Sequence, residues 1–273
     1  MSSTYSPPVD LLLSIGPPTI LDWPEYTELG VRESDVPELI RMATDEDLHR
    51  GDSESDEVWG PIHACRALGQ LRSEAAVGPL IRFMQEIEEI DDWLMDDLPL
   101  VFGLIGPPAI AELARLLPDS SIRQSARLTA VTGLQLIGAR NPDRRDEIVE
   151  ILTRQLEHWE DQDHELNGML ISELLSLEAV EAAPLIEKVI AANRTIIGYH
   201  GDWEDVQVSL GLLEKRLTPR PDRFHRGHRT GLAHFSDDAA LTRAARERME
   251  AERAKQKAKR KQAKQSRKRN RRK

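Results

Sequence analysis

The sequence predicts an all-α protein, an α-solenoid of about five helical hairpins followed by a basic C-terminal tail. Three observations lead to this prediction: a recurring two-helix pattern, an aliphatic apolar composition, and a change of charge near the C-terminus. Apolar residues make up 40% of the 273 residues, whereas aromatic residues make up only 4%. An aliphatic core suits helices packed closely on helices better than it suits a β-sandwich.

The recurring pattern is clearest at 67–84, which reads ALGQLRSEAAVGPLIRFM. An apolar stretch is followed by a short polar break and by a second apolar stretch. Similar segments occur at 28–43, 101–117, 133–156 and 174–190, with the same order and break position. This match favours an array over a compact bundle with accidental self-similarity. Aligning the second stretches gives a column spaced by 41, 33, 39 and 33 residues, which contains Arg41, Arg82, Arg115, Arg154 and Glu187.

Each copy predicts two helices and the break between them. Apolar residues recur every three or four positions in the second stretches, as in 77–84 and 148–156. Proline lies in the breaks or first turns, where a missing backbone N–H costs least, at Pro37, Pro79 and Pro142. We therefore expect at least ten helices in antiparallel pairs from about residue 10 to residue 217, and essentially no strand.

These residues resemble a known repeat class. The segment HACRALGQL followed by AAVGPLIRFM is similar to the HEAT-like repeats of the phycobilisome-lyase type, and the resemblance covers about 23–217. The order VWGPIHACRALGQLRSEAAVGPLI, LPLVFGLIGPPAI and GDWEDVQVSLGLL also resembles a family of bacterial HEAT-like proteins without assigned function. The resemblance implies a HEAT-like solenoid. It implies no lyase activity, because scaffolds, adaptors, DNA-repair proteins and enzymes share this repeat.

The chain divides into four predicted parts. Residues 1–22 form an N-terminal lead-in, 23–217 the repeat solenoid, 218–235 a linker, and 236–273 a helical or disordered basic tail. The linker is marked by prolines and glycines, and the tail is rich in Ala, Arg, Glu and Lys with almost no apolar face.

The formal net charge of −10 conceals two parts of opposite sign. Residues 240–273 contain 16 Lys and Arg and 3 Glu, a net charge of +13, so the remainder carries −23. We expect the tail to bind RNA or a ribosome-like polyanion, with binding to the acidic body, or to neither, as alternatives. The predicted nucleic-acid-binding residues are Lys255, Lys257, Lys259, Arg260, Lys261, Lys264, Arg267, Lys268, Arg269, Arg271, Arg272 and Lys273.

Composition also indicates the compartment. Cys65 is the single cysteine, so no intramolecular disulfide forms and a reducing environment is expected. The N-terminal sequence MSSTYSPPVDLLLSIGPP has no basic region of the kind that begins a signal peptide. No stretch approaches 18 uninterrupted apolar residues. We expect a cytoplasmic protein with no membrane partner.

No pattern predicts a catalytic, cofactor or metal site. Di-iron hydroxylases of this repeat class need several His-Glu pairs, and this sequence has one, at 164–165. His63 and Cys65 are two positions apart on a helix and do not share a face, so we expect a core cysteine and a histidine at the rim. The acidic segment 86–99 and the histidines of 218–235 are interpreted as a solvated loop and a linker.

The arginine column is the main candidate for partner binding. Equivalent positions of successive second helices stack along the concave wall of a solenoid, so the column should form a ladder. The arginines either tie neighbouring repeats together or bind an acidic or phosphorylated partner. Trp203 either closes the open end of the array, with Asp202 as the helix N-cap, or marks a partner site.

These observations predict a non-catalytic scaffold or adaptor. The groove would hold a protein, and the tail would hold RNA or a ribosomal surface. The alternative is a lyase or chaperone-lyase subunit acting on a tetrapyrrole-bearing protein, which only the repeat resemblance suggests.

Overall fold

The computed structural model describes residues 5–19, 22–52, 55–86 and 92–219. Within these residues the chain forms eleven α-helices and eight 3-10 helices and contains no strand, so the all-α prediction is confirmed. The chain divides into two compact units, residues 1–233 and 234–273. The second unit lies outside the described residues, whereas the first contains all of them.

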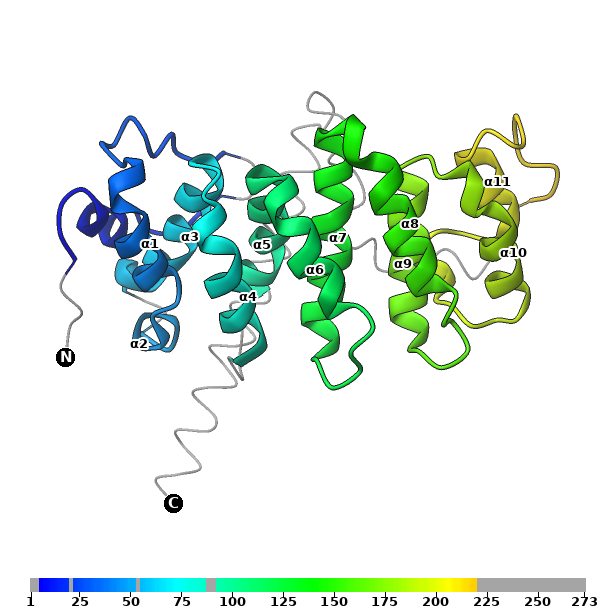
Figure 1. Cartoon of the computed structure of the whole chain (residues 1–273), viewed down its shortest axis with the longest axis horizontal. Helices are drawn as coiled ribbons and strands as arrows, with labels where there is room; N and C mark the ends of the chain where they lie inside the picture. The colour runs from blue at the N-terminus through cyan, green and yellow to red at the C-terminus, as the bar shows by residue number, and fades with distance from the viewer. Residues whose placement is uncertain (1–4, 20–21, 53–54, 87–91, 220–273) are drawn as a thin grey trace, which may run out of the picture. The chain divides into compact units, whose positions relative to one another are not determined.

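From α3 to α10 the helices follow one another as first and second members of pairs (Figure 1). In the described residues no α-helix precedes α1, so the first predicted hairpin lacks its first helix. Each first helix packs on the next, α3 on α5, α5 on α7 and α7 on α9, and α1 packs on α3 and α4. This packing is consistent with a helical array. The first helices are α3 (Gly60–Gln70), α5 (Asp92–Ile105), α7 (Gln124–Arg140) and α9 (His164–Ser176). The second helices are α1 (Val36–Ala43), α4 (Val77–Glu86), α6 (Ile110–Leu116), α8 (Arg145–Leu156) and α10 (Ala183–Ala191).

The break of each pair is a short helical turn rather than an open loop. Arg72, Gly106 and Glu178 adopt positive φ just after a first helix, which ends the helix and redirects the chain. A 3-10 turn then leads directly into every second helix. These turns are η2 (Glu33–Asp35), η4 (Glu74–Ala76), η5 (Pro107–Ala109), η6 (Pro142–Arg144) and η7 (Val180–Ala182).

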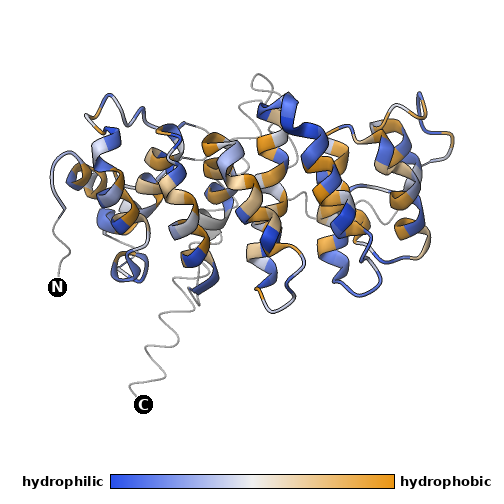
Figure 2. Ribbon diagram, viewed as in Figure 1, coloured by the Kyte–Doolittle hydropathy of each residue, from blue (hydrophilic) through white to orange (hydrophobic). Residues whose placement is uncertain are grey.

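The core is one continuous aliphatic cluster between the helices (Figure 2). Small residues allow the first helices to approach closely, as α5 and α7 do. A Cβ added at Gly103 on α5 would lie 2.8 Å from Cβ of Leu136 on α7. Glycine is therefore required at this crossing, because both atoms belong to rigid parts of the helices.

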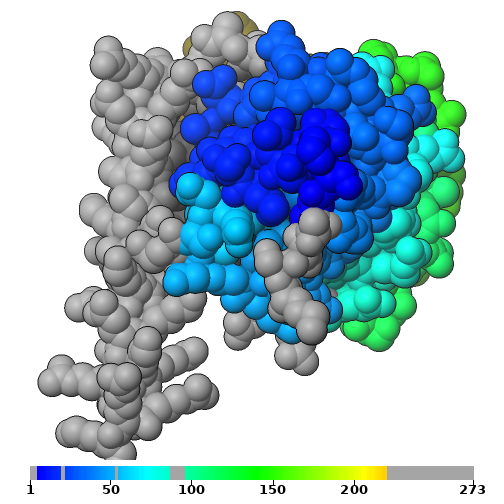
Figure 3. Space-filling view, turned by 90° about the vertical axis from the view of Figure 1, so that its left-hand side faces the viewer, coloured from blue at the N-terminus to red at the C-terminus, as the bar shows by residue number. Residues whose placement is uncertain are grey.

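The N-terminal lead-in belongs to the same core as the helix pairs. Val9 and Leu12, in the 3-10 helix η1 (Val9–Ser14), are buried in this cluster. The hydroxyl of Tyr5 donates a hydrogen bond of 2.7 Å to Asp45, which precedes the short helix α2 (Glu46–His49). Figure 3 shows the N-terminal residues, in dark blue, lying over this end of the unit.

The other end of the described array carries α11 (Trp203–Ser209). Asp202 is its N-cap, as the sequence predicted, and forms a capping box with Asp205. Trp203 is partly buried against the core at this end. Arg216 binds both carboxylate oxygens of Asp202, at 2.5 and 2.8 Å, so the chain folds back onto the start of α11.

Among the described residues no single helix has the length and apolarity of a membrane span. The bent pair Asp96–Ile105 and Pro107–Leu116 reaches these criteria only when its two members are taken together.

Candidate functional site: a groove beside α8

The predicted column lies at equivalent places on the second helices. All five side chains are exposed. The residues are Arg41 on α1, Arg82 on α4, Arg115 on α6, Arg154 on α8 and Glu187 on α10.

Three of the four arginines, Arg41, Arg115 and Arg154, pair with a carboxylate of their own helix. Arg115 lies 2.5 Å from Glu112, three residues earlier, and Arg154 pairs with Glu150, four residues earlier. Exposed pairs of this kind contribute about 0–1 kcal/mol. Arg115 and Arg154 therefore act neither as strong ties between repeats nor as uncompensated positive charges.

Arg41 has a different environment, at the lead-in. Its guanidinium lies 4.0 Å from the centre of the Tyr5 ring and donates to Glu38 at 2.9 Å. The same carboxylate oxygen of Glu38 accepts a 2.8 Å hydrogen bond from the backbone N–H of Ser6. Arg41 thus helps to hold the N-terminal residues on α1.

Other arginines, outside the column, tie the pairs together. Arg123, just before α7, donates to the carbonyls of Met84 and Gln85 at 2.9 and 3.0 Å. Arg145, at the start of α8, donates to the carbonyl of Leu177 at 2.9 Å. The alignment missed them because they lie at the ends of helices, where their partners are main-chain carbonyls of a distant segment.

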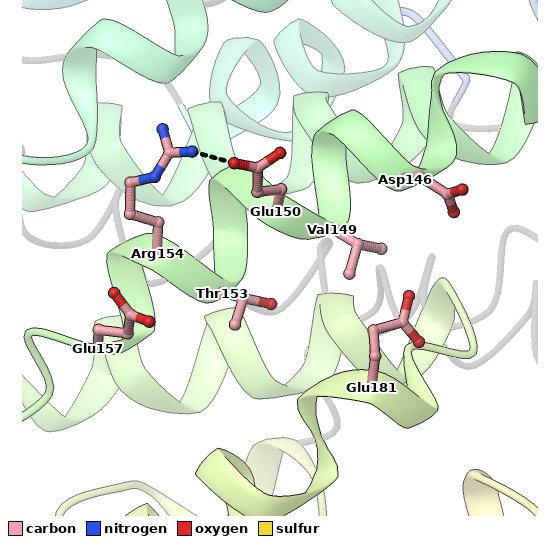
Figure 4. A pocket seen from close by; sticks show the side chains of 7 residues that line it. All are labelled: Asp146, Val149, Glu150, Thr153, Arg154, Glu157 and Glu181. Atoms are coloured by element: carbon pink, nitrogen blue, oxygen red, sulfur yellow. Dashed lines mark hydrogen bonds and ion pairs between the residues drawn. The ribbon is translucent and has the colours of Figure 1, made fainter.

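A shallow groove of about 400 Å³ runs along α8 and faces η7 (Figure 4). Its lining on α8 follows a spacing of three and four residues, so these side chains share one face of the helix. Four carboxylates and one guanidinium dominate the lining. The residues are Asp146, Val149, Glu150, Thr153 and Arg154 of α8, Glu157 directly after it, and Glu181 of η7.

Arg145 fixes one end of this groove. Its guanidinium donates to Asp146 and to Glu181, each at 2.8 Å, and so links α8 to η7. The hydrogen bond from Arg145 lowers the pKa of Glu181 below its usual value. Arg145 thus favours the ionised form of Glu181.

Besides its charged side chains, the groove lining has one apolar side chain and one hydroxyl group. Val149 supplies an apolar patch, and Thr153 brings a buried hydroxyl oxygen that has no hydrogen-bond partner. The groove can therefore accept hydrogen bonds from a cationic group and cover its aliphatic stem.

A second polar cluster is buried between α3 and the lead-in. Nε2 of His63 donates to the carbonyl of Gly16 at 2.9 Å, so Nδ1 accepts the 2.7 Å hydrogen bond from the hydroxyl of Tyr26. His63 is 1% exposed, so its expected place at the rim is wrong, whereas Cys65 is buried in the core as expected. Burial lowers the pKa of His63 and raises the pKa of Cys65, which keeps both groups neutral.

Arg66 and Asp97 form the ionic part of this cluster. Nε and Nη2 of Arg66 donate to the two carboxylate oxygens of Asp97 at 2.7 and 3.0 Å. The guanidinium also lies 4.6 Å from the centre of the Trp23 ring. Arg66 and Asp97 are 0% and 3% exposed, so the pair is closed to solvent and joins α3, α5 and the segment before η2. The expectation of a solvated loop over 86–99 is therefore wrong from Asp92 onward, because these residues form the first turns of α5 and Asp97 is buried there as the partner of Arg66.

Several predicted residues lie outside the described residues. The whole predicted nucleic-acid-binding site, Lys255 to Lys273, lies there together with the rest of the basic tail. The histidines of the linker lie there as well. Within the part of the chain that the structure describes, no group of three or more His, Cys, Asp or Glu side chains is placed to hold a metal ion.

Comparison of the chain with protein-family models, with curated proteins and with solved structures finds no match.

Proposed function

We propose that this chain is a HEAT-like α-solenoid that acts as a non-catalytic scaffold. It binds a cationic segment of a partner protein in the α8 groove and a polyanion, such as RNA or a ribosomal surface, through its basic tail. The acidic groove is the observation that supports the protein-binding part of this proposal. The net charge of +13 over 240–273 supports the part that concerns the tail.

The pairing of the arginines indicates whether the expected partner is acidic or basic. Arg115 and Arg154 are each matched by a carboxylate of their own helix, so they offer little attraction to an acidic partner. The groove has four carboxylates against the guanidiniums of Arg154 and, at its end, Arg145, which leaves a net charge of −2. Among the described residues Glu157 is in no ion pair, so a lysine or arginine side chain of a partner would bind there first, and Val149 would cover part of its stem.

Replacing Glu150 and Glu157 by Gln should weaken the binding of a fluorescent Lys/Arg-rich peptide to the full chain. Two exposed ionic contacts of about 0.5–1 kcal/mol each correspond to a loss of roughly 5- to 30-fold, measured by fluorescence anisotropy at low salt. The matched control is Glu33→Gln with Glu74→Gln, which removes the same charge from exposed positions in η2 and η4. Equal weakening in the two variants would show that binding follows net charge and not the groove.

Deleting residues 240–273 should abolish RNA binding. The chain has no aromatic residue from Ala239 onward, so the tail offers no stacking platform and should bind without sequence preference. If about six phosphates are neutralised, log K should fall with log salt with a slope of about −4 to −5. Binding of full-length and truncated protein to unrelated RNAs across a salt series measures this. Equal RNA affinity of the full-length and truncated proteins would show that the tail does not bind the RNA.

A further inference from the structure

A single carboxyl group is buried where α9 packs on α7. Glu173 of α9 is 6% exposed, and its Oε1 accepts a 3.1 Å hydrogen bond from the hydroxyl of Thr132 on α7. The same hydroxyl lies 3.7 Å from the sulfur of Met169, one turn earlier on α9. The joint between these two helices thus contains an ionisable group whose hydrogen-bond partner is a neutral hydroxyl.

The charged groups on the surrounding elements are engaged elsewhere. On α7, Arg127 donates to the carbonyl of Leu117. On α8, Arg145 binds main-chain carbonyls and Glu181.

Two further groups complete these surroundings. Arg140, at the end of α7, lies against α5, because its Nη1 would be 3.0 Å from a Cβ added at Gly103. On the 3-10 helix η8 (Ile197–Tyr199), Tyr199 donates to Glu165 in the first turn of α9. Burial raises the pKa of Glu173 to about 7, and the hydrogen bond from Thr132 opposes this shift.

Burial and pairing explain why the charged form is unfavourable here. An ionised carboxylate removed from water needs a cation or several hydrogen bonds to offset its lost hydration. One hydroxyl donor does not supply this. The protonated carboxyl group avoids the cost and can itself donate a hydrogen bond, so the packed joint favours the neutral form.

We propose that Glu173 is a pH-sensitive latch of the α7–α9 joint, which closes when its carboxyl group is protonated and loosens when the proton is lost to solvent. The inference does not depend on the proposed scaffold function. Because the pKa is raised on folding, the stabilisation is fully present below the usual value of 4.5 and is lost as the pH rises through about 7. The joint should therefore respond to pH near neutrality.

The test compares Glu173→Gln with the unchanged full chain by amide hydrogen exchange, after correction for the intrinsic pH dependence of exchange. In the unchanged chain the opening constant of α7 and α9 should rise about tenfold from pH 6 to pH 8. In Glu173→Gln, which keeps the size and the acceptor, this rise should disappear. Glu187→Gln, at an exposed position of α10, is the control and should retain it.

A second variant tests the direction of the effect. Thr132→Val removes the hydroxyl that favours the carboxylate, so the pH at which the joint loosens should increase. An unchanged pH dependence in Glu173→Gln would overturn the proposal, as would a shift to lower pH in Thr132→Val. If Glu173→Gln fails to fold, the pH at the midpoint of the rise in the opening constant of Thr132→Val still tests the proposal. A midpoint above that of the unchanged chain supports it, and one below contradicts it.

Discussion

Replacing Asp97 by Asn should lower the free energy of unfolding by about 3–5 kcal/mol, since it leaves the guanidinium of Arg66 buried without its counter-charge. Both side chains are almost completely inaccessible, and the pair joins α3 to α5 through two hydrogen bonds. The amide retains one acceptor oxygen but presents an N–H₂ donor to a group that can only donate. Urea unfolding followed by circular dichroism measures the loss.

Two comparisons isolate the buried charge as the cause. Glu112→Gln breaks the exposed pair with Arg115 by the same chemical change and should cost less than about 1 kcal/mol. Replacing Arg66 by Met and Asp97 by Leu together should cost less than Asp97→Asn alone, because no uncompensated charge remains. A double variant as unstable as the single variant would mean that packing, and not charge, dominates at this place.

Local sequence patterns predicted the helices of the repeat region, because each copy of the pattern supports the interpretation of the others. Apolar residues at intervals of three and four and proline near each break indicated where second helices begin, and each begins after a 3-10 turn at that place. The ends of the array were less predictable. His63, Arg66 and Gln70 share one face of α3, but their partners lie before η2 and on α5, at sequence separations that no local pattern encodes.

The sequence predicted where the column residues lie on the second helices, but it did not predict what their side chains contact. The alignment identified equivalent places on the second helices, yet a shared position does not determine what a long side chain contacts. Glutamates three or four residues before Arg41, Arg115 and Arg154 were a visible signal that these arginines pair within their helices. The groove was not predictable, since it depends on how far η7 stands from α8.

The second large effect is expected at Asn167, which is completely buried in α9. Its amide nitrogen donates to the carbonyls of Trp159 and Arg194 at 3.0 and 2.7 Å, and its oxygen accepts from Gln162 at 2.7 Å. This amide therefore connects the segment before α9 with the segment after α10. No charged residue can replace it without leaving at least one of these groups unpaired.

Replacing Asn167 by Asp should destabilise the protein by about 3–5 kcal/mol at pH 8, because a carboxylate oxygen would then face two carbonyl oxygens in a buried site. The loss should diminish as the pH falls, since the introduced carboxyl group has a raised pKa in the folded state and is protonated there first. Asn193→Asp makes the same change at an exposed position with φ of 54°, a conformation that Asp tolerates, and should cost less than about 0.5 kcal/mol. Thermal unfolding of both variants between pH 5 and pH 8 distinguishes them. A loss at Asn167 that is small, or that grows toward low pH, would show that the amide does not hold these two carbonyls together.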